Sequence, residues 1–452
     1  MIAAVILIFI IGYLTIVFEH PLRLDKTVPA LLMGSGMWAV VAVGFYSGGL
    51  NIVDGHNHIF SMAGVSDQVA IEASEEGFVA ALTHHIGKIA EILVFLIGAM
   101  TIVELIDLHR GFDVIKEWIH TRNKKRLLWI TGVLAFFLSA IIDNLTTTIV
   151  LISLLRKLIP DRNERIWFVC LIITAANAGG AWSPIGDVTT TMLWIGKKVT
   201  TIHLIEFIVL PAIVCFVVPY FLVSFKSVFK GDLKEEDNRD GFNKRLLSSK
   251  TMLFVGLAMI IFVPIFKTLT HLPPYIGMML SLGVVWAVSE YIHPEENFEE
   301  SERHKYSPHK ALSRIEMSSI LFFLGILLAI AAFETAVIGD VSILRSGADA
   351  LSNSIPNINI IIILMGFLSA VIDNVPLVAA AMGMYNNPVD DHLWHFIAYT
   401  AGTGGSMLII GSAAGVAAMG MEKIDFIWYF KNIGWLALAG YLAGCAVFLI
   451  EV

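Results

Sequence analysis

Long apolar runs, separated by short charged or proline-containing loops, follow one another along almost the whole chain. A helix needs about 20 mainly apolar residues to cross the hydrocarbon core of a bilayer, and many of these runs are close to that length. The pattern therefore predicts an all-α membrane protein. Its spanning segments are expected near residues 2–18, 28–48, 86–108, 165–200, 203–225, 251–268, 273–292, 316–338, 392–421 and 432–450.

Two further apolar runs, residues 125–158 and 356–386, do not fit a single crossing. The first has basic clusters at both ends, residues 124–126 and 156–157, and the positive-inside rule keeps both of these ends in the cytoplasm. One straight helix of roughly 33 residues would also reach about 50 Å, against a hydrocarbon core of about 30 Å. We therefore predict a re-entrant helical hairpin that turns around residues 142–144. The second run has no basic residue close by and is predicted to open to the outside.

These two hairpins carry the strongest internal repeat in the chain. Phe137–Asn144 recurs as Phe367–Asn374, and the two copies differ only by Ile141 against Val371. A pattern of three glycines recurs as well, at Gly179, Gly180 and Gly186 and again at Gly404, Gly405 and Gly411.

The repeat divides the chain into two predicted halves. An odd number of crossings separates the hairpins, so the two copies are expected to have opposite topology, the inverted-repeat plan of many secondary transporters. Each half would hold about five spanning helices plus one hairpin, and broken helices would meet near the bilayer midplane. We expect a first repeat at residues 1–225, a cytoplasmic linker at 226–250 and a second repeat at 251–452.

Loop charges give the predicted orientation. Residues 49–87 contain acids but no Lys or Arg, whereas residues 110–126, 226–250 and 303–314 are rich in basic side chains. The positive-inside rule then places both termini outside. The first apolar segment lacks a basic start and a cleavage site, so we expect it to remain as a helix.

Composition agrees with this picture. The chain is 57% hydrophobic and only 15% charged, with a mean hydropathy of +0.77, whereas a soluble domain averages about 25% charged. A net charge of −8 gives no basic signature for nucleic acid. The three cysteines show no metal-binding spacing. The apolar composition makes membrane lipid the expected partner.

Two aspartates, Asp143 and Asp373, occupy the predicted hairpin tips. An acid at the centre of a spanning helix costs roughly 2.5–3.5 kcal/mol on insertion scales, so such residues usually have a function. The alternative is a tip in aqueous solvent, where Asp-Asn is ordinary turn chemistry. We favour function because the motif occurs twice, and because Thr146, Thr147 and Thr148 follow the first copy.

A third acid, Asp187, lies in a predicted spanning helix that Gly179, Gly180 and Pro184 should interrupt. Side-chain oxygens surround it in the sequence, and oxygen is the ligand type that hard cations prefer. The second half has hydroxyls in the matching interruption but no acid. These candidate ligands are Asn177, Ser183, Thr189 and Thr190 in the first half, and Ser406 and Ser412 in the second.

The charge of these segments favours a cation or a proton as cargo. Helix N-termini can bind anions, but neither interrupted segment nor either hairpin tip carries Arg or Lys. Local acids would repel an anion. For Gly411 and Gly415, close helix packing through a GxxxG pair is an equally good explanation.

Glu91 lies inside the third predicted helix, preceded by His84 and Lys88. It is a candidate proton relay or ion entrance. The alternative is a pair with Lys88, three residues before it on the same helix face.

The motifs Ser139–Thr148, Ser369–Asn374 and Asn177–Thr190 resemble the NhaD-type sodium/proton antiporters of the ion-transporter superfamily, over almost the whole chain. The resemblance implies exchange of Na⁺ or Li⁺ for H⁺ and pH homeostasis in the inner membrane. It also implies a homodimer with a scaffold domain and a moving transport domain. His84 and Glu91 match a modulating His/Glu pair of that family. The implied transport residues are Asp143, Asn144, Thr146, Asn177, Asp187, Thr189, Ser369, Asp373, Asn374 and Ser406 or Ser412, with Na⁺ held at Asp143, Asn144, Asn177 and Asp187.

The predicted mechanism is competition between Na⁺ and H⁺ for the same carboxylates, with alternating access and no resident cofactor. Burial and a neighbouring like charge favour the protonated form of a carboxylate, so protonation would expel sodium. One alternative is a carrier for dicarboxylates or arsenite on the same scaffold, although the hairpin tips here have Ile-Asp-Asn in place of the Ser-Asn-Thr of those carriers. A passive channel and an intramembrane aspartyl protease using Asp143 and Asp373 are further alternatives, and the protease would need a GxGD motif that this chain lacks.

Overall fold

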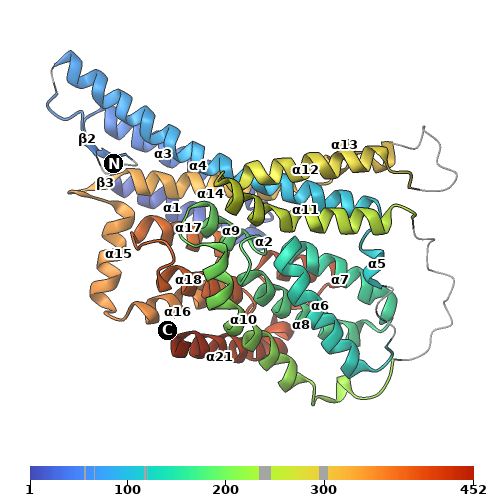
Figure 1. The fold of residues 1–452 in the computed structure, drawn as a ribbon. Coiled ribbons are helices and arrows are strands. Elements are labelled where there is room, and N and C mark those ends of the chain that lie inside the picture. The colour runs from blue at the N-terminus through green and yellow to red at the C-terminus, as the bar shows by residue number, and fades with distance from the viewer. Residues whose placement is uncertain are drawn as a thin grey trace. The chain divides into compact units, whose positions relative to one another are not determined.

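The computed structural model describes residues 1–54, 58–65, 67–116, 119, 121–233, 246–294 and 304–451. These residues fold almost entirely into helices (Figure 1), because a backbone in lipid must satisfy its N–H and C=O groups within the segment. The predicted all-α class is confirmed. Part of the predicted linker, residues 234–245, lies outside the described residues.

Chain contacts divide the protein into two compact units. The first unit contains Met1–Val94, Glu316–Ile361 and Val375–Pro388, and the second contains Phe95–Ile315, Ile362–Asn374 and Val389–Val452. Each unit takes segments from both predicted repeats. The division of the chain into inverted repeats stays a prediction.

The first unit is built around two long helices that pack closely, α3 and α14. A side chain on Gly34 of α3 would lie 2.5 Å from the carbonyl of Gly325 in α14, so glycine is required at that crossing. Trp38 donates a hydrogen bond of 2.9 Å to the Leu328 carbonyl. The helices of this unit are α1 (Ile2–Val17), α2 (Glu19–Leu22), α3 (Thr27–Tyr46), most of α4 (Gln68–Leu108), α14 (Met317–Thr335), α15 (Ile343–Ser354) and nearly all of α17 (Asn374–Met384).

The same unit contains two short antiparallel strand pairs. Strand β1 (Ile52–Val53) pairs with β2 (Ile59–Phe60), with Ile52 opposite Phe60. Strand β3 (Val337–Ile338) pairs with β4 (Val341–Ser342), with Val337 opposite Ser342. An isolated bridge from Ile52 to Ala336 joins the two pairs.

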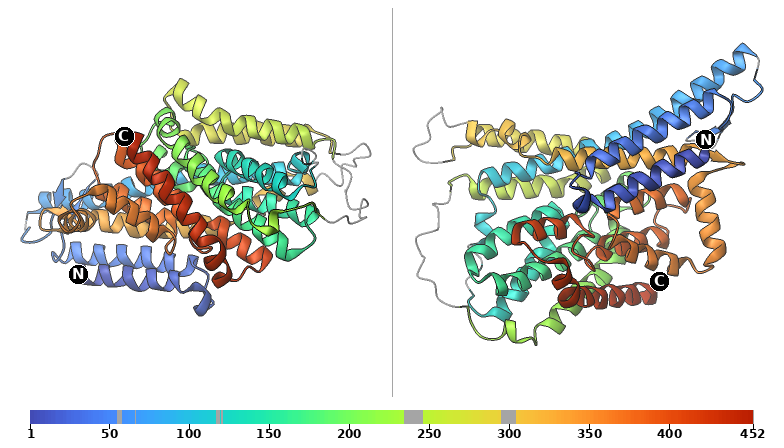
Figure 2. Two further views of the ribbon diagram at one scale, coloured as in Figure 1. Left: turned by 90° about the horizontal axis from the view of Figure 1, so that it is seen from below. Right: turned by 180° about the vertical axis from the view of Figure 1, so that it is seen from behind.

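The second unit is a helical bundle in which α10 packs along α21, α6 along α8, and α11 along α12. Figure 2 shows α10 and α21 side by side. Its elements are the end of α4, α5 (Asp113–Lys116), α6 (Lys124–Ile142), α7 (Asn144–Leu158), α8 (Arg162–Ala181), α9 (Val188–Ile195), α10 (Thr201–Val223), η1 (Ser227–Phe229), α11 (Ser249–Thr270), α12 (Pro274–Tyr291), α13 (Pro308–Leu312), most of α16 (Ile358–Ser369), α18 (His392–Gly404), α19 (Ala413–Glu422), α20 (Phe426–Tyr429), the π-helical turn η4 (Phe430–Gly434) and α21 (Trp435–Glu451).

Seven helices among the described residues are long and apolar enough to cross a membrane, and eight if the bent α15–α16 pair counts as one span. The shorter apolar helices α1 and α17 fall below that length. Two of the predicted spanning segments, 165–200 and 392–421, are interrupted helices, and the helices of segments 2–18 and 273–292 are not among these seven.

The interruptions fall at the polar motifs. Helix α6 ends at Ile142 and α7 begins at Asn144, so Asp143 alone separates them. Helix α8 ends at Ala181 and α9 begins at Val188, while α18 ends at Gly404 and α19 begins at Ala413.

Glycines allow the backbone segments to approach at these interruptions. A side chain on Gly179 would collide with the Phe136 carbonyl, and one on Gly404 would collide with the Gly366 carbonyl. A side chain on Gly411 would lie 2.5 Å from the Ala370 carbonyl, and one on Gly415 would collide with the Ile409 carbonyl. Gly411 precedes α19, and the neighbour of Gly415 lies in the interruption just before that helix, so helix packing through a GxxxG pair stays a prediction.

Candidate functional site

Asp143 forms the N-cap of α7. Its Oδ1 accepts a hydrogen bond of 2.8 Å from the Thr146 backbone N–H, and its Oδ2 accepts one of 2.9 Å from the Thr146 hydroxyl. The backbone of Asp143 has φ 75° and ψ 161°, a region that is essentially restricted to glycine and costs about 1–3 kcal/mol. Strained residues of this kind persist where the surroundings fix them, and they cluster at functional sites.

Asp187 forms the N-cap of α9 and is buried. Its Oδ1 accepts hydrogen bonds of 2.8 Å from both the backbone N–H and the hydroxyl of Thr189. The hydroxyl of Thr190 donates to the Asp187 carbonyl at 2.9 Å. Two of the three predicted acids thus begin short helices, where the positive end of the helix dipole stabilises a carboxylate.

Asparagine side chains connect Asp187 to both hairpin tips. Asn144 Nδ2 donates to Asp187 Oδ2 at 2.8 Å and to Asn177 Oδ1 at 3.0 Å. Asn374 Nδ2 lies 3.4 Å from each carboxylate oxygen of Asp187. All four residues are buried, so segments far apart in the sequence meet at this carboxylate.

Asn177 extends the network to the interruption between α18 and α19. Its Nδ2 donates to the Ser406 hydroxyl at 2.9 Å and to the Ser412 hydroxyl at 3.0 Å. Ser412 is the N-cap of α19 and accepts from the Gly415 backbone N–H at 3.2 Å. We refer to Asp143, Asn144, Asn177, Asp187, Asn374, Ser406 and Ser412 as the polar core.

The remaining predicted residues lie around the polar core with different partners. Asp373 is partly buried, directly before Asn374, and its charge interacts with that of Asp187, as does the charge of Asp143. Ser183 Oγ accepts from the Ile185 N–H at 3.4 Å. The buried hydroxyl of Thr147 has no hydrogen-bond partner within the described chain.

Ser369 donates to a backbone carbonyl, that of Ala401, at 2.8 Å. Ser139, at the matching position of the first motif, donates to the Ala176 carbonyl at 2.6 Å. Both serines therefore pin a hairpin arm to an interrupted helix. Ser139 was missed as a candidate, although its repeat partner Ser369 was a signal in the sequence.

Tyr429 was also missed. Its hydroxyl donates to the Ser406 carbonyl at 2.7 Å, which supports the backbone beneath the polar core. It lies in an apolar run, where nothing in the pattern separates it from other packed aromatic residues.

The histidine candidate lies in the first unit. His84 is exposed, Glu91 is partly buried, and the neighbouring His85 is the buried histidine. His85 Nδ1 lies 3.9 Å from Glu334 Oε2. Glu334 was a weaker candidate of the same kind as Glu91 in the sequence, but its contact with His85 was not predicted.

The donor set of the polar core consists of carboxylates, amides and hydroxyls. Within the described chain, no lysine or arginine side chain donates to Asp143 or Asp187. The described residues also contain no cluster of three or more His, Cys, Asp or Glu side chains that could hold a metal ion. Oxygen donors of this kind suit a hard cation as cargo rather than a resident transition metal.

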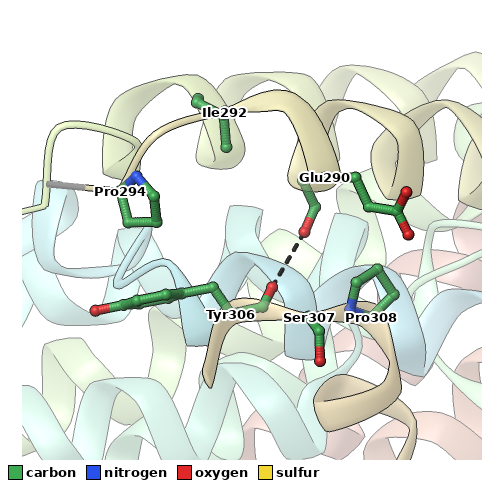
Figure 3. Close-up of a pocket in the computed structure, with 7 residues that line it drawn as sticks. Glu290, Ile292, Pro294, Tyr306, Ser307 and Pro308 are labelled. Atoms are coloured by element: carbon green, nitrogen blue, oxygen red, sulfur yellow. Dashed lines mark hydrogen bonds between the residues drawn. The ribbon is translucent and has the colours of Figure 1, made fainter. Parts of the chain in front are cut away.

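A pocket of about 240 Å³ lies elsewhere in the second unit. Ser289, Tyr306 and Pro308 are among its lining residues, and the Ser289 hydroxyl donates to the Tyr306 carbonyl at 3.3 Å (Figure 3). The carboxylate of Glu290 accepts from the Trp286 indole at 2.9 Å. None of the predicted site residues lines this pocket.

Comparisons with known proteins agree on one family. A family model described as a citrate transporter matches residues 4–402. Sodium/proton antiporter 2 of Arabidopsis thaliana is 42% identical over 98% of this chain and 98% of its own length, and sodium/proton antiporter 1 of the same plant is 46% identical over 99% of this chain and 72% of its own length. The Na⁺/H⁺ antiporter NhaD of Vibrio cholerae is 30% identical over 99% of this chain and 91% of its own length. The chain is therefore an integral membrane transporter that belongs to the NhaD-type sodium/proton antiporters of the citrate-transporter family.

Proposed function

We propose that this protein exchanges Na⁺, or Li⁺, for H⁺ at the polar core. One observation carries the proposal: the buried Asp187 carboxylate receives amide donors from both hairpin tips, through Asn144 and Asn374, and no basic side chain within the described residues donates to it. The charge of Asp143 acts on the same carboxylate. A buried negative charge held by neutral donors attracts a cation.

Sodium would bind where the amide groups now donate. The NH₂ groups of Asn144 and Asn374 face Asp187, so a cation on that carboxylate replaces them as its partners. Each amide can then turn its oxygen to the ion, since an amide carries a donor and an acceptor at similar positions. Asp143, Asn144, Asn177 and Asp187 would supply the main ligands, assisted by Thr189, Ser406 and Ser412.

Protons would compete with sodium for these carboxylates. The charges of Asp143 and Asp187 act on each other, and like charges in one network repel unless a cation or a proton is bound. Either Na⁺ or H⁺ neutralises part of this negative charge, and binding of one disfavours binding of the other. This competition couples the two fluxes at one site.

Several parts of the transport cycle are proposed along with the ion site. The hairpins and interrupted helices would move as one bundle between the two sides of the membrane, in a chain of two inverted repeats. We propose a homodimer in the cytoplasmic membrane, or its organellar counterpart, with both termini on the outer side.

An anionic cargo fits this geometry poorly. Helix N-termini of the kind found at α7 and α9 can bind anions, but here Asp143 and Asp187 already cap them with carboxylates. A second negative group at the same position would be repelled.

The direct test uses purified protein in proteoliposomes with a pH-sensitive dye inside. Addition of Na⁺ or Li⁺ is expected to move protons in the opposite direction, while K⁺ provides the comparison for ion preference. Asp143→Asn and Asp187→Asn are expected to abolish exchange, and Asn163→Ala, at an exposed position of α8, serves as the control. Full exchange in both aspartate variants would refute the assignment, and sodium-dependent uptake of a labelled dicarboxylate would favour an anion carrier.

A further inference from the structure

A buried glutamate and its arginine partners lie at the far ends of the helices that form the polar core. Glu422, the last residue of α19, is 2% exposed. Its Oε1 lies 2.7 Å from Arg156 Nε, at the end of α7. Its Oε2 lies 3.0 Å from Arg165 Nη2 and 3.1 Å from Arg165 Nε, in the first turn of α8.

Further arginine contacts cap the end of α19. Arg162 donates to the Glu422 carbonyl at 2.8 Å and to the Lys423 carbonyl at 2.7 Å, and Arg156 also donates to the Met421 carbonyl. Cations at a helix C-terminus stabilise the unpaired carbonyls and the negative end of the dipole. We refer to Glu422, Arg156, Arg162 and Arg165 as the arginine clamp.

Each helix held by the clamp carries a polar-core residue at its other end. Helix α7 begins beside Asp143, α19 begins at its N-cap Ser412, and α8 carries Asn177. At 1.5 Å per residue, α19 places Glu422 about 15 Å from Ser412, and α7 places Arg156 about 20 Å from Asp143. The three helices also pack against one another along their lengths.

We propose that Glu422 is a positioning residue of the antiporter, which fixes the relative register of α7, α8 and α19 and thereby the geometry of the polar core. A buried carboxylate is costly unless it is fully paired, and replacing such a pair with apolar side chains is often neutral or stabilising. Fixing a register is the best-supported use of a buried pair. The sodium-affinity part of this proposal rests on the proposed function.

The variant Glu422→Gln keeps the shape of the side chain and removes its charge. Because a shift of one helix changes the distances among Asn177, Asp143 and Ser412, we expect the apparent KM for Na⁺ to rise roughly fivefold or more, with a smaller change in maximal rate. Arg156→Gln, at a half-exposed position, should move KM in the same direction by less, and Arg156→Lys should restore part of the change.

The matched control is Glu164→Gln. It breaks a 2.7 Å ion pair with Lys124 at the beginning of the same helix α8 but leaves α19 untouched. Its KM for Na⁺ should stay within twofold of the wild-type value. A Glu422→Gln KM equal to that of Glu164→Gln, in a folded protein, would overturn the proposal.

Hydrogen exchange gives a second readout that does not depend on transport. In Glu422→Gln, faster exchange should extend along α19 as far as the amide of Gly415, which donates to the Ser412 cap. Faster exchange confined to the last turn of α19 would mean that the clamp only prevents fraying, and would refute the positioning role. If the wild-type protein shows no Na⁺-driven proton movement, the proposed function is refuted. The hydrogen-exchange result for Glu422→Gln would still decide whether Glu422 is a positioning residue.

Discussion

Replacing Asn177 with alanine removes three hydrogen bonds from the centre of the polar core. Asn177 is fully buried, accepts from Asn144 at 3.0 Å and donates to Ser406 at 2.9 Å and to Ser412 at 3.0 Å. A neutral hydrogen bond contributes about 0.5–1.5 kcal/mol net, so the free energy of unfolding should fall by roughly 2–4 kcal/mol. The same change releases Asn144, whose amide then no longer has a second partner to orient it toward Asp187.

The effect on sodium follows from that released amide. A loss of about 1 kcal/mol in the sodium-bound state corresponds to a roughly fivefold change in affinity, so we expect the apparent KM for Na⁺ of Asn177→Ala to rise five- to tenfold. Thermal unfolding in detergent and KM in proteoliposomes measure the two effects. Asn163→Ala is the control on the same helix, since this exposed side chain has no contact with the polar core. An Asn177→Ala variant with the melting temperature and KM of the control would refute this account of the network.

Three further predictions concern packing, charge and helix ends. Gly179→Ala should lower the free energy of unfolding by about 1–3 kcal/mol, because the new methyl group collides with a backbone carbonyl of α6. The control is Gly420→Ala, whose added carbon meets no neighbouring atom within 4 Å. This control should be neutral or stabilising in a thermal-shift assay. Burial alone would raise the pKa of Asp390, but hydrogen bonds from Thr200 and His203 outweigh this effect and hold the pKa below its usual value. Asp390→Asn should therefore lower the melting temperature at pH 7. The difference from wild type should disappear as the pH falls through the lowered pKa. Lys267→Met should destabilise the protein by about 1–3 kcal/mol, since Lys267 Nζ donates at 3.1 Å to a carbonyl near the end of α9; equal melting temperatures for this variant and wild type would contradict that role.

Much of the site could be predicted from the sequence because its chemistry is local. Asp143 and Asp187 stand where apolar runs are interrupted, so each could be expected to begin a helix, and the structure makes each an N-cap. The repeated Asp-Asn motif also pointed to Asn374, which lies beside Asp187. The positions of these residues follow from the pattern of apolar runs and from the glycine and proline residues that interrupt them.

Tertiary partners could not be predicted in the same way. In the sequence, Arg156 served only as evidence that both ends of the first hairpin lie in the cytoplasm. In the structure, Arg156, Arg162 and Arg165 contact Glu422, more than 250 positions along the chain. His84 and His85 are adjacent, but they lie on different sides of α4, and only His85 is buried. The sequence alone does not indicate which side of the helix is buried. The two compact units combine segments from both ends of the chain, which no local pattern encodes.

Competition between sodium and protons is tested most directly by the pH dependence of the apparent KM for Na⁺ in wild-type proteoliposomes. If both ions use the carboxylates of Asp143 and Asp187, KM should rise about tenfold for each unit of falling pH on the acidic side, for one competing proton, while the maximal rate at saturating Na⁺ stays constant. A KM that stays constant across that pH range, with only the maximal rate changing, would show that protons do not compete for the sodium site.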